Sequence, residues 1–189
     1  MTEFTLHTID TAPQEALPLL EKSVAAFGMI PNLHGVMAEA PELLQAYQDV
    51  HTLFQNTSFD ADERNVIWLA ISVENQCHYC VPAHSAIAKM QGVADDIIEQ
   101  LRDYSALTNP RLEALRTFTL QIVRQRGQLD SSQVQEFLDA GFTRRHILEV
   151  ILGVAQKTIS NYVNHFADTP VDAPFTELAW TPPASVAAE

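Results

Sequence analysis

Positive charge is scarce in this sequence. Its 189 residues include 24 acidic but only 11 basic residues, which gives a formal net charge of -13. Such a chain repels phosphate backbones and anionic membrane surfaces, and no basic run reverses this charge locally. We therefore expect neither nucleic acid nor a membrane among its partners.

Long hydrophobic runs are absent as well. No segment approaches the roughly 18 uninterrupted apolar residues of a membrane span, and the opening MTEFTLHTIDTAPQEA lacks the basic and apolar regions of a secretion signal. With 47% hydrophobic residues, the composition is nevertheless that of a folded protein. We expect a soluble, cytoplasmic protein with a single domain over residues 1–169 and an extended C-terminal tail over 170–189, which is rich in proline and alanine.

Patterns typical of β-strands are also missing, because no run alternates convincingly with a period of two. Apolar residues recur instead at helical spacing, as in Leu43, Tyr47, Val50 and Phe54. The pattern predicts an all-α protein, a bundle of about seven or eight helices. They fall within the ranges 13–27, 32–39, 41–56, 60–75, 78–91, 94–103, 110–126, 131–139 and 143–166, of which the shortest are the least well defined.

Two of these helices have almost no polar face. VIWLAISV (66–73) contains only Ser72 as a polar residue, and ILEVILGVA (147–155) contains only Glu149. Helices that are apolar all round are buried. We expect both segments in the centre of the bundle or at a subunit interface.

The only two cysteines lie three positions apart in ENQCHYCVPAH, residues 74–84. On a helix, Cys77, Cys80 and His84 share one face. Since Pro82 is tolerated only in the first turn, the helix should begin close to Cys77 to Cys80, where the positive end of the helix dipole favours a thiolate. The imidazole can take the proton and the second cysteine can resolve an oxidised first one, so the pattern predicts a dithiol redox centre.

Two other interpretations of the cysteines stay open. They could be inert core residues that happen to be close together. They could also bind zinc, although Cys77, Cys80 and His84 supply only three of the usual four ligands, and His78 lies off their face. We expect neither a metal nor an organic cofactor.

The motif E-x2-C-x-Y-C-x3-H resembles the alkylhydroperoxidase D (AhpD)-like branch of the carboxymuconolactone decarboxylase family. The resemblance is clear over residues 60–92, and the later NYVNHFADTPVD (161–172) is similar to a segment of related members. It implies an all-helical bundle of the AhpD-like type that assembles as a homo-oligomer, either a dimer, a trimer or a hexamer. The motif residues here are Glu74, Cys77, Tyr79, Cys80 and His84.

The resemblance also implies an activity. In AhpD-like enzymes the two thiols cycle between dithiol and disulfide while a hydroperoxide is reduced, and a histidine and a glutamate form a proton relay. This implies that Cys80 attacks the peroxide, that Cys77 resolves the sulfenic acid, and that His84 and Glu74 form the relay. An external thiol reductant or a disulfide partner protein would then reduce the disulfide. In thioredoxin-type centres the first cysteine attacks instead, so the opposite assignment stays open.

The sequence departs from the AhpD pattern in two places. AhpD itself resembles C-x-H-C and has its relay glutamate twelve residues before the first cysteine, whereas these positions here hold Tyr79 and Asn65. Glu74 or Glu63 could supply the missing carboxylate. Tyr79 could donate a hydrogen bond to a thiolate or a peroxide oxygen, or it could simply pack in the core.

We therefore expect a thiol-dependent peroxidase. The alternatives are a dithiol disulfide reductase that serves a peroxiredoxin partner, and a non-catalytic helical oligomer whose CxxC binds zinc or senses oxidation. Because the founding decarboxylases of the family lack the CxxC, lactone decarboxylation is not expected.

Other polar residues are less informative. His51 lies on an amphipathic helix with no ionisable cluster around it in the sequence, so we expect it at the surface or at a helix end. Asn161, Asn164 and His165 either line the site or form a polar helix end. Phe175 and Trp180 are expected to anchor the tail, on a neighbouring subunit in one interpretation.

Overall fold

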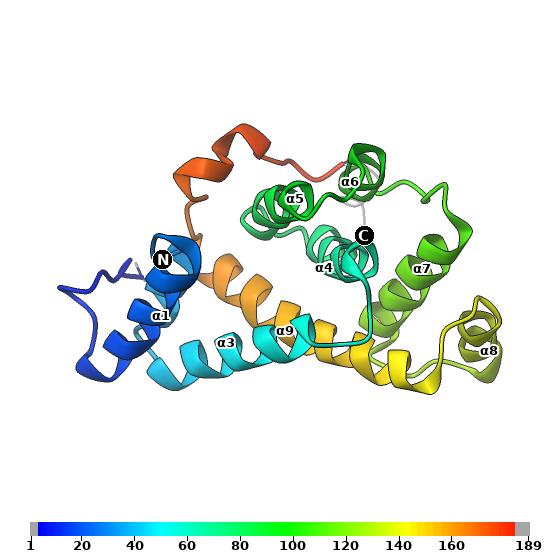
Figure 1. The fold of residues 1–189 in the computed structure, drawn as a ribbon, viewed down its shortest axis with the longest axis horizontal. Coiled ribbons are helices and arrows are strands. Elements are labelled where there is room, and N and C mark those ends of the chain that lie inside the picture. The colour runs from blue at the N-terminus through cyan, green and yellow to red at the C-terminus, as the bar shows by residue number, and fades with distance from the viewer. Residues whose placement is uncertain (1–3, 184–189) are drawn as a thin grey trace.

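The protein folds into helices. A computed structural model describes residues 4–183, and within them nine α-helices and two 3-10 helices but no strands occur (Figure 1). Each predicted range holds one α-helix to within one residue, so the all-α prediction is confirmed, although the expected number of about seven or eight was too low. None of the helices in this part of the chain is long and apolar enough to cross a membrane. The elements are η1 (Gln14–Ala16), α1 (Leu17–Phe27), α2 (Asn32–Met37), α3 (Pro41–Gln55), α4 (Ala61–Glu74), α5 (Cys80–Met90), α6 (Asp95–Arg102), α7 (Pro110–Gln125), α8 (Ser131–Asp139), α9 (Arg144–Ala167) and η2 (Ala173–Leu178).

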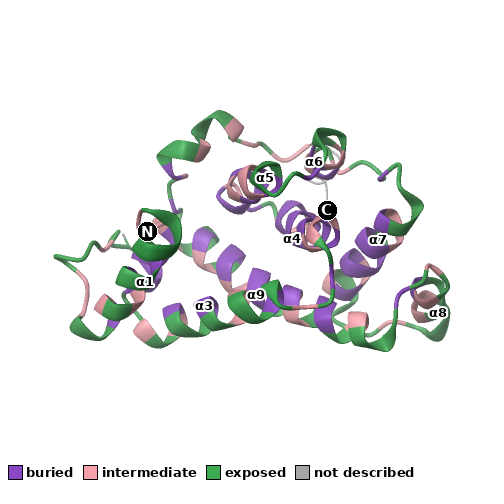
Figure 2. Ribbon diagram, viewed as in Figure 1, coloured by how far each residue is buried: buried purple, intermediate pink, exposed green. Residues whose placement is uncertain are grey.

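Helix α4 lies at the centre of the bundle. It packs against α5, α6, α7 and α9 (Figure 1), and all of residues 65–73 are buried (Figure 2). Trp68, with no exposed surface, is its largest side chain. A capping box between Asp60 and Glu63 starts the helix by satisfying its free amide groups. The expectation that 66–73 lies in the centre is therefore confirmed.

Helix α9 is buried on one face only. Gly153 lies on the inner face, where a Cβ atom would come within 2.7 Å of the Phe54 ring. The outer face carries four apolar side chains that are exposed by 46% to 82%. They are Leu148, Ile151, Tyr162 and Phe166. The inner face of segment 147–155 is thus buried in the bundle, as expected. The outer face is exposed in the single chain and is a candidate subunit interface.

The C-terminal segment folds back over its own chain. Residues 173–178 form η2, which packs against α5 at the top of Figure 1. Asp172 Oδ1 accepts a hydrogen bond from the Asn32 amide at 2.8 Å, and Trp180 Nε1 donates to the Arg102 carbonyl at 2.9 Å. The tail predicted to be extended is therefore partly helical, because its side chains find partners on α2 and α6. Its last residues, 184–189, lie outside the described part.

Candidate functional site

Cys77 and Cys80 lie at the junction between α4 and α5. α4 ends at Glu74 and α5 begins at Cys80, which leaves Pro82 in the first turn as predicted. Both cysteines are free thiols, and only 0% and 2% of their surfaces are exposed. The Cys80 amide donates a hydrogen bond to Cys77 Sγ at 3.3 Å. The turn therefore brings the two residues of the motif into direct contact.

A polar stripe on α9 forms the wall opposite the thiols. Asn164 Nδ2 donates to Cys80 Sγ at 3.3 Å. Lys157 Nζ, by contrast, has no hydrogen-bond partner among the described residues, although the side chain is completely buried. An unpaired buried ammonium is costly, so its presence beside two thiols indicates a functional role. The stripe consists of Gln156, Lys157, Ser160, Asn161 and Asn164, all with no exposed surface.

The two thiols differ in their ionisation. Burial by itself raises the pKa of Cys80, but the hydrogen bond from Cys77 and the positive charge of Lys157 together lower that pKa well below its usual value. The pKa of Cys77 is raised, because its thiol is hydrogen-bonded to Cys80 and is buried. The site thus favours a thiolate at Cys80 next to a protonated thiol at Cys77.

His84 lies on α5 one turn after Cys80 and is buried. Its ring centroid is 4.9 Å from that of Trp68, and its Nδ1 atom has no hydrogen-bond partner within residues 4–183. Burial and the charge of Lys157 lower the pKa of His84 well below its usual value. The imidazole is therefore neutral at pH 7, and it is an unpartnered polar group in the site.

His51 belongs to the same site, contrary to the expectation of a surface or helix-end role. Its ring stacks on Trp68 at a centroid distance of 5.7 Å. Gln156 connects the two residues, because its Oε1 accepts from Trp68 Nε1 at 2.8 Å while its Nε2 lies 2.8 Å from His51 Nδ1. Burial, and then the charge of Lys157, lower the pKa of His51 to about 4. Partners from α4 and α9 thus supply the cluster that the local sequence lacks.

Glu74 has partners outside the thiol site. Its Oε1 accepts from Arg124 Nε at 2.6 Å, and its Oε2 accepts from the Tyr104 hydroxyl at 2.6 Å. These bonds tie the end of α4 to α7 and to the loop after α6. Since both carboxylate oxygens are bound in this way, the geometry favours a structural role for Glu74 over the predicted relay.

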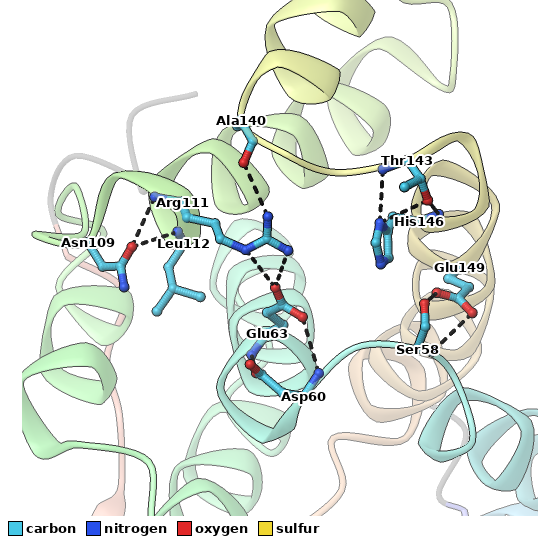
Figure 3. Close-up of polar contacts among 10 residues, drawn as sticks. All are labelled: Ser58, Asp60, Glu63, Asn109, Arg111, Leu112, Ala140, Thr143, His146 and Glu149. Atoms are coloured by element: carbon cyan, nitrogen blue, oxygen red, sulfur yellow. Dashed lines mark hydrogen bonds and ion pairs between the residues drawn. The ribbon is translucent and has the colours of Figure 1, made fainter.

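Glu63 lies near the opposite end of α4. It is eleven residues before Glu74, or about 16 Å along the helix axis. Figure 3 shows its carboxylate held by Arg111, whose Nε and Nη2 donate to Oε1 at 3.1 and 2.8 Å, and by the Asp60 amide, which donates to Oε2 at 3.1 Å. The suggestion that Glu63 serves the thiols is therefore not supported by its position.

Tyr79 anchors the C-terminal segment. Its hydroxyl donates to Asp172 Oδ2 at 2.5 Å and accepts from the Leu33 amide at 3.3 Å. Burial and the charge of Asp172 raise the pKa of Tyr79 well above its usual value. With these partners the hydroxyl is committed to α2 and the tail, and the suggested hydrogen bond to a thiolate or peroxide is not formed.

The three-ligand zinc arrangement that the sequence left open does not form. Within residues 4–183, no group of three or more histidine, cysteine, aspartate or glutamate side chains is arranged so that it could hold a metal ion. Cys77 and Cys80 have Lys157 as a charged neighbour instead of further ligands.

The sequence analysis missed Gln156 and Lys157 and left Asn161 and Asn164 undecided. A signal was present, because the polar residues of 156–164 recur every four positions on a helix that is otherwise apolar. A polar stripe on a helix predicted to be buried indicates a buried polar site. His165, which was considered with them, is exposed.

Comparison with known proteins agrees with this site. The sequence profile of the carboxymuconolactone decarboxylase family matches residues 41–118, a range that includes both cysteines and His84. The resemblance stated from the sequence is thereby confirmed. No curated protein sequence matches the chain.

Solved structures share the fold over almost the whole chain. An AhpD-core, uncharacterized peroxidase-related protein from Ralstonia eutropha JMP134 has a TM-score of 0.81 at 21% identity, covering 92% of this chain and 93% of that one. An uncharacterized peroxidase-related protein from Silicibacter sp. TM1040 has a TM-score of 0.77 at 21% identity, covering 92% and 95%. The debrominase Bmp8, as a cysteine-to-alanine variant in complex with 2,3,4-tribromopyrrole, has a TM-score of 0.74 at 18% identity and covers 92% of both chains. At these identities the likeness establishes an AhpD-like, all-helical fold.

Proposed function

We propose that the protein is a thiol-dependent peroxidase in which Cys80 attacks a hydroperoxide. The observation that carries the proposal is the contact between two buried thiols, in which the Cys80 amide donates to Cys77 Sγ and Asn164 Nδ2 donates to Cys80 Sγ, both at 3.3 Å. The lowered pKa of Cys80 and the raised pKa of Cys77 agree with it. A thiolate is the nucleophile in this chemistry, while the resolving residue begins as a thiol. The names of two peroxidase-related structural neighbours agree with the proposal.

The proposed cycle balances within the dithiol. The Cys80 sulfur bonds to the terminal peroxide oxygen, the O–O bond breaks, and the alcohol leaves with one proton. Cys77 then attacks the Cys80 sulfenic acid, so that an S–S bond forms and water leaves. The two thiols lose two electrons and two protons in total, and an external dithiol restores them by thiol–disulfide exchange.

Lys157 and Asn164 stabilise the thiolate in this proposal. The lysine contributes positive charge, and the amide donates a hydrogen bond to Cys80 Sγ. His84 is neutral and offers an unpartnered ring nitrogen, so its proposed role is a hydrogen bond to the peroxide or to the leaving alcohol. Because Glu74 and Glu63 are bound elsewhere, we assign no step to them.

The burial of the thiols favours a small oxidant over the alternative of a protein disulfide. Cys77 and Cys80 expose 0% and 2% of their surfaces, so the disulfide of a peroxiredoxin partner reaches them only after the site opens. The fold alone does not define the acceptor. The debrominase neighbour supports a second candidate, in which the same two thiols form a disulfide while a carbon–halogen bond of an aromatic compound becomes C–H and halide.

We also propose that the protein forms a homo-oligomer through the outer face of α9. Leu148, Ile151, Tyr162 and Phe166 recur at helical spacing on one exposed, uncharged stripe. Copies with a net charge of -13 repel one another elsewhere, so an apolar contact is the favourable one. We predict that Phe166→Glu lowers the molar mass measured by light scattering, whereas Lys22→Glu on α1 does not. An unchanged mass for Phe166→Glu contradicts this interface.

The peroxidase proposal is tested by the consumption of tert-butyl hydroperoxide under dithiothreitol turnover. We expect wild type to consume peroxide and its oxidised form to lose the mass of about two hydrogens. Cys80→Ser should be inactive and His84→Ala should be slower. Cys77→Ser, treated with peroxide after dithiothreitol has been removed, should stop after one turnover with a dimedone-reactive sulfenic acid. A wild type that consumes no peroxide and whose thiols resist oxidation refutes the proposal, whereas debromination of 2,3,4-tribromopyrrole without peroxide consumption selects the second candidate.

A further inference from the structure

A cavity of about 260 Å³ lies between α1, α2 and α3, in addition to the thiol site described above. Its volume is slightly below the range of about 300–1,000 Å³ that is usual for drug-sized ligands, so it suits a molecule with a single ring. The residues that characterise it are Ser23, Phe27, His34, Tyr47, Gln48 and His51.

Aromatic rings form a continuous wall of this cavity. The His34 ring meets Phe27 edge-on at a centroid distance of 5.7 Å and meets Tyr47 edge-on at 5.6 Å. Tyr47 in turn stacks on His51 at 6.3 Å. Ring faces and edges of this kind favour contact with another flat aromatic ring.

Apart from Lys22, no residue that lines the cavity is charged at neutral pH. Burial, with a second contribution from the neighbouring His51, lowers the pKa of His34 to about 4, and the pKa of His51 is likewise about 4. Both imidazoles are therefore neutral at pH 7. Lys22, also on the lining, lies 4.0 Å from the Asp49 carboxylate. An ionised ligand would lose hydration on entering without finding an opposite charge that is free, so the cavity favours a neutral one.

One buried polar atom of a residue that lines the cavity has no donor among the described residues. Gln48 Nε2 donates to the Leu19 carbonyl and to Ser23 Oγ, both at 3.0 Å, which sets the orientation of the amide. Gln48 Oε1 is buried and has no hydrogen-bond partner in the part of the chain that is described. Since buried acceptors are nearly always satisfied, this oxygen is suited to an O–H or N–H group of a ligand.

Tyr47 connects the cavity with the thiols. It lines the cavity and also belongs to the apolar cluster that contains Cys77 and Cys80. Burial is the main cause that raises the pKa of Tyr47 above its usual value, and the charge of Cys80 is the second. The effect of this charge reflects how close the two groups are. A substrate held against Tyr47 therefore lies next to a side chain that packs with Cys80, and the Tyr47 side chain has to move aside before the peroxide contacts the sulfur, because only 2% of Cys80 is exposed.

We propose that this cavity is the substrate site of the thiol centre and that it takes a small, uncharged aromatic molecule with an O–H or N–H donor, such as an arylalkyl hydroperoxide. The identity of the reacting group rests on the proposed peroxidase function. The binding of the aromatic body and of its donor does not, because it follows from the cavity alone.

The binding test uses 2-phenyl-2-propanol, the alcohol that corresponds to cumene hydroperoxide, with the reduced full-length protein. Ligand-observed NMR should show saturable binding to wild type. Ala26→Trp, an exposed position on α1 that lines the cavity, should weaken binding by at least about tenfold. Ala25→Trp is the matched control, because this neighbour is equally exposed but is not part of the lining, and it should bind as wild type does.

Two further ligands test the class of molecule. 2-Cyclohexyl-2-propanol should bind about twofold to tenfold more weakly than the phenyl compound, the difference expected from aromatic contacts. The methyl ether of 2-phenyl-2-propanol, which has no donor, should also bind more weakly. Equal binding of all three compounds, or no saturable binding to wild type, overturns the proposal.

Kinetics separate this proposal from the proposed function. If wild type consumes cumene hydroperoxide, Ala26→Trp should raise the KM for it relative to Ala25→Trp and leave the KM for hydrogen peroxide unchanged. Equal kinetics of the two variants overturn the cavity assignment while the peroxidase function stands. If no peroxide is consumed but the alcohol binds and Ala26→Trp weakens it, the peroxidase function fails while the cavity assignment stands.

Discussion

The Glu63 cluster at the start of α4 and the thiol site beyond its other end differ in how their polar groups are paired. At the start of α4, the carboxylate of Glu63 is held by Arg111 and by its own capping box (Figure 3). At its end, the thiol site contains Lys157 Nζ, His84 Nδ1 and Asn164 Oδ1, none of which has a hydrogen-bond partner among the described residues. Paired polar groups stabilise a fold, while unpaired buried ones destabilise it. The comparison suggests that the first cluster serves stability and that the second is retained for a ligand.

The polar side chains at the start of α9 are also paired by hydrogen bonds. Glu149 accepts from the Ser58 amide at 3.0 Å and from its hydroxyl at 2.5 Å, and Thr143 and His146 form a capping box (Figure 3). The loop before α4 is thereby joined to α9. The same helix α9 thus has paired polar groups at its start and, further along, a buried stripe in which Lys157 Nζ, Asn161 Nδ2 and Asn164 Oδ1 have no hydrogen-bond partner among the described residues.

The largest expected effect is that of Lys157→Met. Removing the ammonium raises the pKa of Cys80, so its alkylation by iodoacetamide at pH 7 should slow by more than about tenfold. In the Cys80→Ser background, where no thiolate balances the ammonium, the free energy of unfolding should rise by about 1 kcal/mol or more, because an unpaired buried charge is replaced by an apolar side chain of similar length. Lys89→Met, which removes an exposed ion pair with Asp95, should change neither value. A Lys157→Met protein that is less stable and equally reactive contradicts the comparison.

Glu63→Leu should lower the stability of the fold without changing the reactivity of Cys80. It leaves the Arg111 guanidinium without its carboxylate and breaks the capping box, so the free energy of unfolding in urea should fall by about 2–3 kcal/mol. The alkylation rate of Cys80 should stay at the wild-type value. Glu21→Leu, on the exposed side of α1, serves as the control for loss of one negative charge. A slower alkylation in Glu63→Leu would restore Glu63 as a candidate for the relay.

A smaller effect is expected for Asn164→Leu. This variant removes the hydrogen bond to Cys80 Sγ, and the pKa of Cys80 should rise by about one unit, which corresponds to about 1.4 kcal/mol. The ultraviolet absorbance of the thiolate, followed against pH, measures this change. His165→Leu alters an exposed neighbour on the same helix and should leave the titration unchanged. A titration of Asn164→Leu that matches wild type would mean that the amide does not stabilise the thiolate.

The last effect concerns the pH dependence of stability. The pKa of His51 is lowered from its ordinary 6.5 to about 4, so between these values the unfolded chain binds a proton that the folded protein does not. Stability therefore falls as the pH decreases from about 6.5 to about 4, by at most about 1.4 kcal/mol per pH unit for this group. Urea unfolding of His51→Gln should show a shallower fall than wild type. His165→Gln, at an exposed position, should retain the wild-type slope, and equal slopes for all three proteins would refute the assignment.

The helices and the thiol pair could be read from the sequence, because both depend on local relations. Apolar periodicity located every α-helix, and Pro82 placed the start of α5 close to Cys80. Cys77 and Cys80 are near each other in any conformation that a CxxC turn allows. The same local reasoning placed His51 outside the site, because it includes only neighbours along the chain. The relay role of Glu74 came from the family resemblance, which does not include the partners that Glu74 finds in this fold.

The remainder was decided by tertiary packing. Lys157 and Cys80 are 77 positions apart in the sequence, yet the charge of the lysine lowers the pKa of the cysteine. Arg124 likewise binds Glu74, from which it is 50 positions away. Whether a thiol becomes a thiolate depends on burial and on such distant charges, and neither is a property of the motif. The cavity between α1, α2 and α3 likewise exists only where three helices meet. The sequence by itself determined which helices form and where the thiols lie, whereas the folded chain decided their ionisation and what surrounds them.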